Sequence, residues 1–492
     1  VLAAYGMYSL TKLPIDAVPD ITNNQVAINV EVPSLSPFEV EKQVTYPIET
    51  AMAGIPGLSY TRSISRNGFA QVTVIFEDNV DLYFARSQVN ERLAQAKEDL
   101  PEGAEPRMGA ISTGLGEIYM WTVEYENPES DFTTPEGRVL KSDFEKAMYL
   151  RTVQDWIIRP QLKTVQGVAE VDAIGGYAQQ YHVQPNPQKL AAVGLTFSDV
   201  IESIERNNSS TGAGFLEQKG ESYVVRADGR LETVDQIANV VLSTRGGIPL
   251  YVKDVATVAL GKELRTGSAS ENGHEVVVGT AMMLKGENSR IVSNAVDMKL
   301  TEINKSLPEG VKAKTVLNRT KLVNATIHTV QKNLGEGALL VVVILFLLLG
   351  NIRAALITAL VIPITMMLTA TGMLKAGISA NLMSMGALDF GLIVDGAVII
   401  TENCLRRLAE RQHHEGRLLT LQERMQEVIE ASRQMIQPAV FGQMIIITVY
   451  LPLLTFTGVE GKMFEPMAMT VIIALIAAFF QSGTGSSSLT TR

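Results

Sequence analysis

The sequence predicts a bundle of membrane-spanning helices joined to a large α+β domain outside the membrane. The chain has 492 residues, which is too long for one ordinary domain. Residues 11–330 contain no apolar run of the about 20 residues needed to cross a bilayer, whereas residues 338–480 consist largely of such runs. Strands and helices alternate within residues 11–330 in an order typical of α+β folds. A mean hydropathy of +0.14 with 19% charged residues is the average of these two unlike parts.

Composition excludes several classes of function. A net charge of −10 disfavours a nucleic-acid binder that relies on phosphate contacts. A single cysteine, Cys404, excludes an intramolecular disulfide and any CxxC site. The sequence has no GxxxxGK[ST] phosphate loop, HExxH motif or Ser-His-Asp arrangement, so it gives no support for an enzyme and predicts no cofactor.

The first part of the α+β region has the order β-α-β-β-α, which is typical of the ferredoxin-like or split βαβ motif. Ser36-Pro37-Phe38-Glu39 is a capping box that starts a helix. Asn67-Gly68 between two alternating segments predicts a β-hairpin. The expected elements are strand Gln25–Val32, a helix ending near Ala53, strands Leu58–Ser65 and Phe69–Phe76, and helix Asp81–Glu98.

The same order recurs further along, which predicts a second, related subdomain. Gly175-Gly176 predicts a hairpin between two of its strands. A third, β-rich piece is expected as an insert within this second subdomain. The expected elements are strands Ile118–Glu124, Val168–Ile174, Ala178–Gln184 and Val276–Leu284, helices Asp143–Val165, Pro187–Val193, Ser198–Arg206 and Arg290–Lys305, strand Val311–Val316, and insert strands Tyr223–Ala227, Val240–Ser243 and Leu250–Val258.

Six membrane segments are expected. The first is a remnant, because Val1–Leu10 resembles the end of an apolar helix, and a truncated N-terminus is therefore predicted. The other five are 338–349, 353–374, 378–405, 438–456 and 467–480. Residues Arg406–Arg433 hold six arginines, so the positive-inside rule predicts that this segment is cytoplasmic. Residues 11–330 then lie on the opposite side, which in a bacterium is the periplasm.

Three carboxylates within the third run are the candidate functional residues. Asp389, Asp395 and Glu402 interrupt an otherwise apolar segment, and a charge near the bilayer centre costs at least about 2.5 kcal/mol. Asp395 and Glu402 are seven residues apart, so they share a helix face about 10 Å apart along the axis. Desolvation favours the protonated form of a carboxylate, as a proton-relay group requires. The alternative interpretation is structural acids paired with basic residues on neighbouring helices.

Metal ligands are harder to predict. The methionines of the membrane part are more readily explained as apolar filler than as soft-metal ligands. The acidic residues Glu117, Glu124, Glu126 and Glu129 have the oxygen chemistry that attracts hard divalent cations, although a solvated surface explains them as well. The sequence therefore singles out no metal-binding residues.

The run DFGLIVDGAVIITEN (389–403) resembles the heavy-metal efflux branch of the resistance-nodulation-division transporters. The segments LPIDAVPD (13–20), VTYPIETAMAGIPG (44–57) and GEGALLVVVILFLLLGNIR (335–353) are similar to the same branch. The spacing of Asp389, Asp395 and Glu402 resembles the cobalt-zinc-cadmium and cobalt-nickel members. Thr401 departs from this pattern, because valine is expected there.

The resemblance implies a proton/cation antiporter, not an enzyme, that exports divalent cobalt, zinc, cadmium or nickel across the bacterial envelope. It implies proton relay and a cation path through Asp389, Asp395 and Glu402. It also implies a homotrimer in the inner membrane that works with a periplasmic adaptor and an outer-membrane channel. A drug or lipid exporter of the same superfamily and a non-transporting scaffold or sensor remain alternatives.

The resemblance also divides the chain. Such transporters have twelve spans, so this chain, with six, is expected to be a truncated N-terminal half, and its tail QSGTGSSSLTTR (481–492) is atypical. The expected divisions are the end of the first transmembrane helix (1–12), the first porter subdomain (13–115), the second porter subdomain (116–208 and 271–330), a β-rich docking subdomain (209–270), transmembrane helices two to six (331–480) and the tail (481–492).

Overall fold

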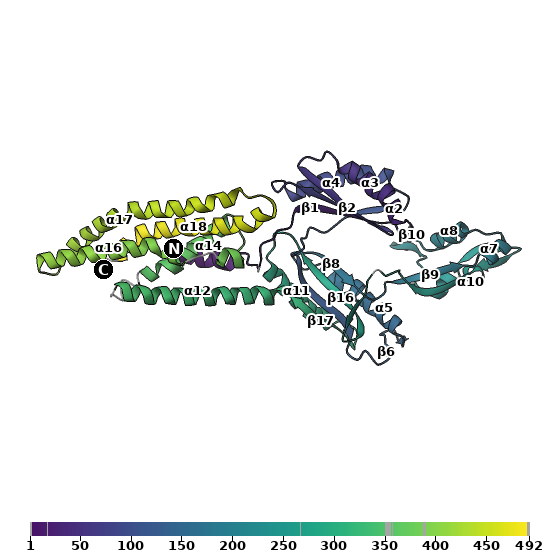
Figure 1. Ribbon diagram of the computed structural model, residues 1–492. Coiled ribbons are helices and arrows are strands. Elements are labelled where there is room, and N and C mark those ends of the chain that lie inside the picture. The colour runs from purple at the N-terminus through teal and green to yellow at the C-terminus, as the bar shows by residue number, and fades with distance from the viewer. Residues whose placement is uncertain are drawn as a thin grey trace.

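The computed structural model describes residues 2–16, 18–265, 267–349, 356, 358–386 and 390–489. Long helices form a bundle at one end of the molecule, and mixed α/β structure forms the other end (Figure 1). Two α+β units lie next to the bundle, and the end furthest from the bundle holds α7, α8, α10 and β9. The expected fold class is confirmed at this level, as a helical bundle joined to an α+β domain.

The first α+β subdomain is a four-stranded sheet in the order β2-β3-β1-β4, covered by helices. The predicted capping box is confirmed, since the Ser36 hydroxyl accepts from the Glu39 backbone and the Glu39 carboxylate accepts from the Ser36 backbone. Its elements are β1 (Asn24–Glu31), α2 (Pro37–Val40), the π-helical turn η1 (Glu41–Thr45), α3 (Tyr46–Met52), β2 (Leu58–Arg66), β3 (Phe69–Phe76), α4 (Leu82–Ala96) and β4 (Glu105–Met108).

Alternation along the strands and four-residue spacing along the helix build this core. Val26, Ile28 and Val30 alternate along β1 and are all buried. The helical segment contributes a buried stripe at Val40, Val44, Ile48 and Met52. The predicted hairpin is confirmed: β2 pairs with β3, and Gly68 turns the chain at φ +70°.

The second subdomain repeats this sheet order with an insertion. Its main strands are β5 (Glu117–Tyr125), β8 (Val168–Ile174), β16 (His274–Met283) and β17 (Val311–Asn318), in the order β8-β16-β5-β17. The short strand β15 (Ala269–Glu271) also pairs with β16 and is the fifth strand of this sheet. Its helices are α5 (Asp143–Val153), the π-helical η3 (Gln154–Ile158), α6 (Arg159–Leu162) and α11 (Ser289–Asn304). Trp121 is fully buried at the centre, and its indole Nε1 donates to the Gln154 Oε1 at 2.9 Å.

The predicted hairpin at Gly175-Gly176 is wrong. β8 pairs with β16, about 100 residues later, and β9 (Gln179–Pro185) pairs with β14 (Ala256–Lys262). Both glycines have positive φ, but Gly176 packs so closely on α5 that a Cβ there would lie 2.7 Å from the Ala147 carbonyl oxygen. The chain therefore leaves the sheet here, and β16 takes the place that a hairpin partner would fill.

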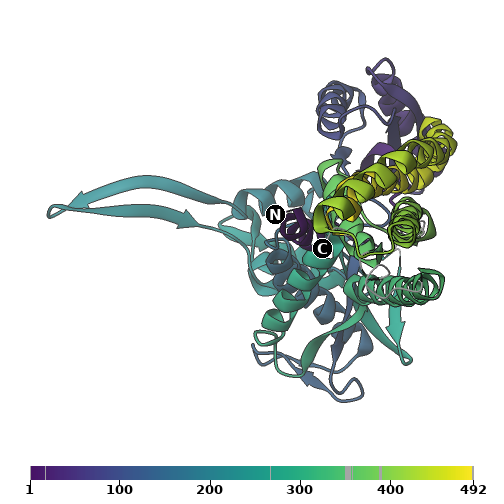
Figure 2. The same cartoon turned by 90° about the vertical axis from the view of Figure 1, so that its left-hand side faces the viewer.

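The inserted part has its own small core. Leu190, Val200 and Val255 are buried together, and Val240, Val252 and Ala256 form a neighbouring cluster. A long two-stranded arm, β10 (Ser210–Gln218) with β11 (Glu221–Asp228), extends away from this unit (Figure 2). The remaining elements of the insert are α7 (Pro187–Val193), α8 (Phe197–Asn207), α9 (Val234–Ala238), β12 (Val241–Arg245), β13 (Ile248–Tyr251) and α10 (Val252–Val255). The short strands β6 (Phe132–Thr133) and β7 (Val139–Leu140) belong to the second subdomain.

The bundle consists of helices from both ends of the chain. Its members are α1 (Leu2–Lys12), α12 (Arg319–Leu349), α14 (Val361–Lys375), α15 (Leu382–Gly386), α16 (Phe390–Glu415), α17 (Leu421–Tyr450), η4 (Leu451–Thr455) and α18 (Gly458–Leu489). Within the described residues, two segments are long and apolar enough to cross a membrane, Leu421–Thr455 and Gly458–Gln481. Val361–Lys375 is a shorter apolar helix. The expectation of six spans remains a prediction.

The arginine-rich segment is a helical hairpin held by ion pairs. It comprises the end of α16 and the start of α17. Glu427 of α17 is buried and lies 2.8 Å from both Arg407 Nε and Arg411 NH1 of α16. Arg417 in the connection lies 2.7 Å from Glu423. These contacts fix the two helices against each other over this charged region.

Candidate functional site

The candidate acids belong to α16, which occupies the middle of the bundle. This helix packs against α12, α14, α17 and α18. Val394 packs with Ile362 of α14, and Ile393 packs with Ala474 and Ala478 of α18. Ile400 packs with Val428 and Ala431 of α17 among other residues. Neighbouring helices therefore bury most of the circumference of α16.

The remaining stripe of α16 is exposed, and it carries Asp395 and Glu402, the two candidate acids that the structure describes. Asp395, Ile399, Glu402 and Arg406 are exposed, with spacings of four, three and four residues, which place them along one face. The side chains between them, such as Ala397 and Ile400, are buried. The prediction that Asp395 and Glu402 share a helix face is confirmed. Asp389 lies outside the described residues.

Asp395 and Glu402 have no hydrogen bond or ion pair with any residue of the described ranges. Arg406, one turn further along, donates instead to the Asn403 Oδ1 at 3.0 Å and lies 3.4 Å from Glu410. The structural interpretation, in which basic residues on neighbouring helices neutralise these acids, has no support within this part of the chain. Two carboxylates on an open stripe are chemically able to bind protons or cations.

Two polar contacts beside the stripe were not predicted from the sequence. Thr401 is fully buried, and its hydroxyl lies 3.4 Å from the hydroxyl of Thr358. Asn403 is also buried and donates to the Ala431 carbonyl oxygen of α17 at 2.9 Å. The only signal in the sequence was that Thr401 stands where valine was expected. The departure therefore adds a polar contact between helices at the level of the acids.

The acidic residues of the second subdomain do not form a metal cage. Glu124 lies 3.3 Å from Lys312, and Glu129 lies 3.5 Å from His274. Glu271 lies 2.5 Å from Lys314, and this hydrogen bond holds the pKa of Glu271 below its usual value. The described part of the chain contains no group of three or more His, Cys, Asp or Glu side chains that could hold a metal ion.

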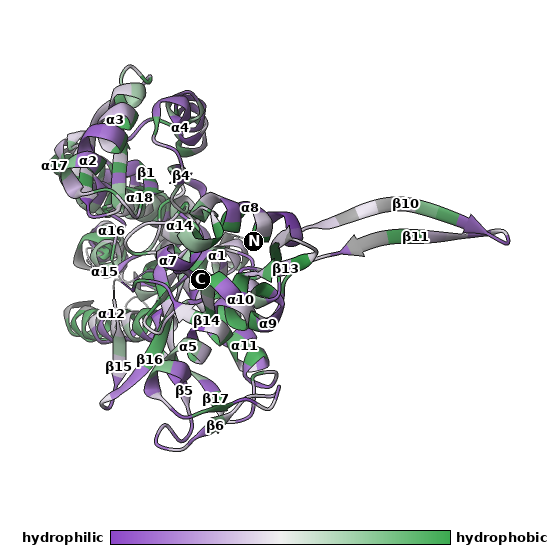
Figure 3. Ribbon diagram, turned by 90° about the vertical axis from the view of Figure 1, so that its right-hand side faces the viewer, coloured by the Kyte–Doolittle hydropathy of each residue, from purple (hydrophilic) through white to green (hydrophobic). Residues whose placement is uncertain are grey.

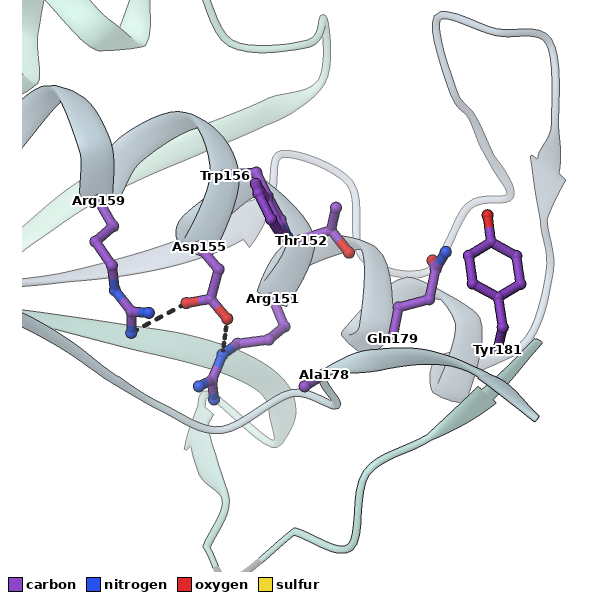
Figure 4. A pocket seen from close by; sticks show the side chains of 8 residues that line it. All are labelled: Arg151, Thr152, Asp155, Trp156, Arg159, Ala178, Gln179 and Tyr181. Atoms are coloured by element: carbon purple, nitrogen blue, oxygen red, sulfur yellow. Dashed lines mark hydrogen bonds and ion pairs between the residues drawn. The ribbon is translucent and has the colours of Figure 1, made fainter. Parts of the chain in front are cut away.

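A cavity of about 510 Å³ lies between the α5–α6 helix and β9 (Figure 4). Asp155 lies between two guanidinium groups on its own helix, 2.7 Å from Arg151 and 3.2 Å from Arg159. The exposed Trp156 and Tyr181 line the cavity. The charges in this cavity are thus paired with each other, which does not suit a cation site.

The chain combines a helical bundle with two α+β subdomains of the same sheet order, and comparison with known proteins identifies its family. The AcrB/AcrD/AcrF family matches residues 1–486. The chain therefore belongs to this family of resistance-nodulation-division transporters.

Individual relatives carry heavy-metal names. The chain is 57% identical to the nickel-cobalt-cadmium resistance protein NccA of Alcaligenes xylosoxydans xylosoxydans, over 98% of this chain and 46% of the relative. It is 55% identical to the cobalt-zinc-cadmium resistance protein CzcA of Cupriavidus metallidurans, over 98% of this chain and 45% of the relative. It is 36% identical to the cation efflux system protein CusA of Escherichia coli (strain K12), over 97% of this chain and 45% of the relative. The chain thus spans about half the length of the curated relatives it matches.

Solved structures give the same result. One described as a heavy metal efflux pump, crystal form I, has a TM-score of 0.83 and 32% identity, and covers 100% of this chain and 46% of that chain. A second structure, crystal form II, has a TM-score of 0.83 and 33% identity, and covers 98% of this chain and 45% of that chain. The fold of this chain is therefore that of the corresponding part of a heavy-metal efflux pump.

Proposed function

We propose that this chain acts within a proton-driven exporter of divalent heavy-metal cations of the cobalt, zinc, cadmium and nickel class. The observation that carries the proposal is the stripe on α16 that exposes Asp395 and Glu402. Acids within a membrane segment face protein or a water path, not lipid, because of their cost in hydrocarbon. An open acidic stripe therefore suits a path for protons.

The higher identity to relatives named for nickel, cobalt, zinc and cadmium favours divalent cations as cargo. Identity is 55% and 57% to these two relatives and 36% to CusA. In the proposal, Asp395 is the main proton carrier, Asp389 assists it, and Glu402 has a smaller role. Each proton moving inward across about 100 mV releases roughly 2.3 kcal/mol, which is available to drive a cation outward if the two movements are coupled.

The proposed setting is the inner membrane of a bacterium, with the α+β subdomains in the periplasm. In this setting the two subdomains are porter units and the inserted unit serves docking. A periplasmic adaptor and an outer-membrane channel are the proposed partners.

A homotrimer is the proposed assembly, and the β10–β11 arm supports it. The arm exposes Phe215, Leu216, Tyr223 and Val224, with Phe215 73% and Val224 71% exposed. Green segments of high hydropathy lie along the arm, far from the body (Figure 3). Phe215 pairs with Val224 and Leu216 pairs with Tyr223, so each face of the arm carries one exposed apolar pair. Exposed apolar side chains grouped on a projecting element suit a contact with another protein chain.

The test uses a chimera in which residues 1–486 replace the aligned segment of CzcA, reconstituted in proteoliposomes with a pH gradient. We expect Asp395→Asn to assemble normally and to lose proton-coupled zinc export, because asparagine keeps the size and cannot titrate. Glu410→Gln, on an exposed part of the same helix, is the matched control and should export normally. Export by Asp395→Asn at the unmodified rate would contradict the proton-relay role.

The same vesicles separate the alternative functions. Zinc and cobalt movement without dye movement supports a cation exporter. Movement of a lipophilic dye without metal would indicate a drug or lipid exporter. No proton flux with any cargo would indicate a scaffold or sensor.

A further inference from the structure

Lys462, near the start of α18, connects the helical bundle to the first α+β subdomain. Its Nζ lies 2.7 Å from the Asp78 carboxylate, in the turn after β3. The same Nζ donates to the Thr22 carbonyl oxygen, in the segment before β1, at 2.9 Å. The Lys462 side chain is 21% exposed, so water competes only partly for these contacts.

The turn that Lys462 reaches belongs to the body of the first subdomain. Asn24, at the start of β1, is buried, and its side-chain amide donates to the carbonyl oxygens of Val80 at 2.6 Å and Glu77 at 3.3 Å. The backbone N–H of Glu77 donates to the Gly57 carbonyl oxygen at 2.9 Å. A force applied at Asp78 is therefore transmitted to the sheet and does not merely displace a loose loop.

The second subdomain is connected to a different helix. Strand β17 ends at Asn318, and α12 begins at Arg319, so the two are continuous. The Asp16 carboxylate accepts a hydrogen bond from the Ser289 hydroxyl at 3.1 Å and lies 3.4 Å from Arg319 NH2. The Arg319 side chain is largely buried. These contacts hold the residues just after α1 against α11 and α12.

The acid-bearing helix lies between the two connections. α16 packs against both α12 and α18, and in Figure 1 α12 lies along the lower edge of the bundle, whereas α18 lies above it, next to α17. A displacement of α16 that changes the spacing of α12 and α18 would act on the two subdomains through different attachments.

We propose that Lys462 is a positioning residue that makes the first subdomain move with α18, while the second moves with α12. The Lys462 contacts to Asp78 and Thr22 carry this inference. Its consequence for export rests on the proposed function: proton binding on α16 changes the separation of the two α+β subdomains through this attachment. The contact itself is testable without transport.

The first test measures hydrogen–deuterium exchange of the purified chain in detergent. Lys462→Gln should raise exchange in peptides covering residues 20–24 and 77–80 by about two- to fivefold, the range of a modest ion pair. Lys299→Gln removes a lysine from a 3.0 Å pair within α11 and is the matched control, with no expected effect on these peptides. Unchanged exchange in Lys462→Gln would overturn the attachment.

The second test measures the protons taken up per zinc ion exported by the CzcA chimera. Lys462→Gln should raise this ratio at least about twofold, because proton binding no longer moves the first subdomain reliably, and Lys462→Arg should restore it. Asp78→Asn, which leaves the Thr22 contact intact, should have a smaller effect in the same direction and covers the case in which Lys462→Gln fails to fold. If Asp78→Asn, and Lys462→Gln where it folds, both left the number of protons per zinc ion unchanged, the positioning role of Lys462 would be overturned. A chimera without any proton flux before substitution contradicts the proposed function, while the exchange measurement still decides the attachment.

Discussion

The hydroxyl of Thr401 on α16 lies 3.4 Å from the hydroxyl of Thr358, and both residues are almost completely buried. Thr401 is one residue before Glu402 and six after Asp395. The contact therefore joins the acid-bearing helix to the segment preceding α14 (Val361–Lys375). Hydrogen bonds of this type between membrane helices contribute about 0.6 kcal/mol on average and up to about 2 kcal/mol.

Replacement of Thr401 by valine tests this contact. We expect Thr401→Val to lower the free energy of unfolding in detergent by about 1 kcal/mol, because the Thr358 hydroxyl loses a partner in a buried site. Thr358→Val and the double variant complete a double-mutant cycle. A coupling energy of zero in that cycle would mean that the two hydroxyls do not interact.

Gly279 on β16 is expected to be intolerant of a side chain. A Cβ at this position would lie 2.2 Å from Trp121 Cε2, and Trp121 is fully buried and hydrogen-bonded to Gln154. Gly279→Ala should cost about 1–3 kcal/mol, the usual range for overpacking a core. Chemical unfolding followed by tryptophan fluorescence measures this loss in the free energy of unfolding.

Gly114→Ala is the control for that substitution, because nothing lies within 4 Å of a Cβ built there. It should leave the unfolding midpoint within error of the unmodified chain. If the two substitutions lowered stability equally, the close approach of Gly279 to Trp121 would not be the cause of the loss.

The pairing of Glu271 with Lys314 predicts a pH dependence of stability. The pKa of Glu271 is lowered in the folded state, chiefly by the hydrogen bond from Lys314. A lowered folded-state pKa adds stability at pH values above the unfolded-state pKa, and this is lost as the pH falls through the folded-state pKa. Glu271→Gln should therefore be less stable than the unmodified chain at pH 7, and the difference should vanish in acid.

Thermal unfolding of both proteins between pH 7 and pH 3 checks this expectation. Glu302→Gln, which removes an exposed carboxylate 3.0 Å from Lys299 within α11, provides a comparison. A difference that grows towards acid would reverse the predicted sign.

The proposed topology predicts opposite accessibility for two exposed positions. His414 lies at the end of α16, and Asn67 lies in the β2–β3 turn. Single cysteines at these positions, in a Cys404→Ser background, should react from opposite sides with an impermeant thiol reagent. The background change is mild because Cys404 is buried beside the Ser432 hydroxyl. Labelling of a cysteine at 414 from outside intact cells would contradict the topology.

The apolar arm predicts the oligomeric state. Phe215→Ser combined with Val224→Ser should weaken self-association of the purified chain or of the CzcA chimera, because both side chains are more than 70% exposed on the arm. Light scattering after size-exclusion chromatography gives the mass. Leu264→Ser removes an even more exposed apolar side chain from outside the arm and should leave the mass unchanged. An unaltered trimer in the double variant would exclude the arm as an essential contact.

Local signals in the sequence determined most of the secondary structure. The Ser36 capping box, the Asn67-Gly68 turn and the alternation along Asn24–Glu31 act within a few residues, so they predict elements without knowledge of the fold. The placement of Asp395 and Glu402 on one helix face follows from helical periodicity alone.

Tertiary structure decided what those elements pair with and which faces remain open. Gly175-Gly176 has the composition of a hairpin, yet β8 pairs with β16, because the alignment of distant strands is set by packing around Trp121. Thr358, Thr401 and Lys462 acquire their partners only when helices far apart in sequence come together. Periodicity establishes that two side chains share a face of one helix, but only the packing of the other helices determines that this face, with Asp395 and Glu402, is the one left exposed.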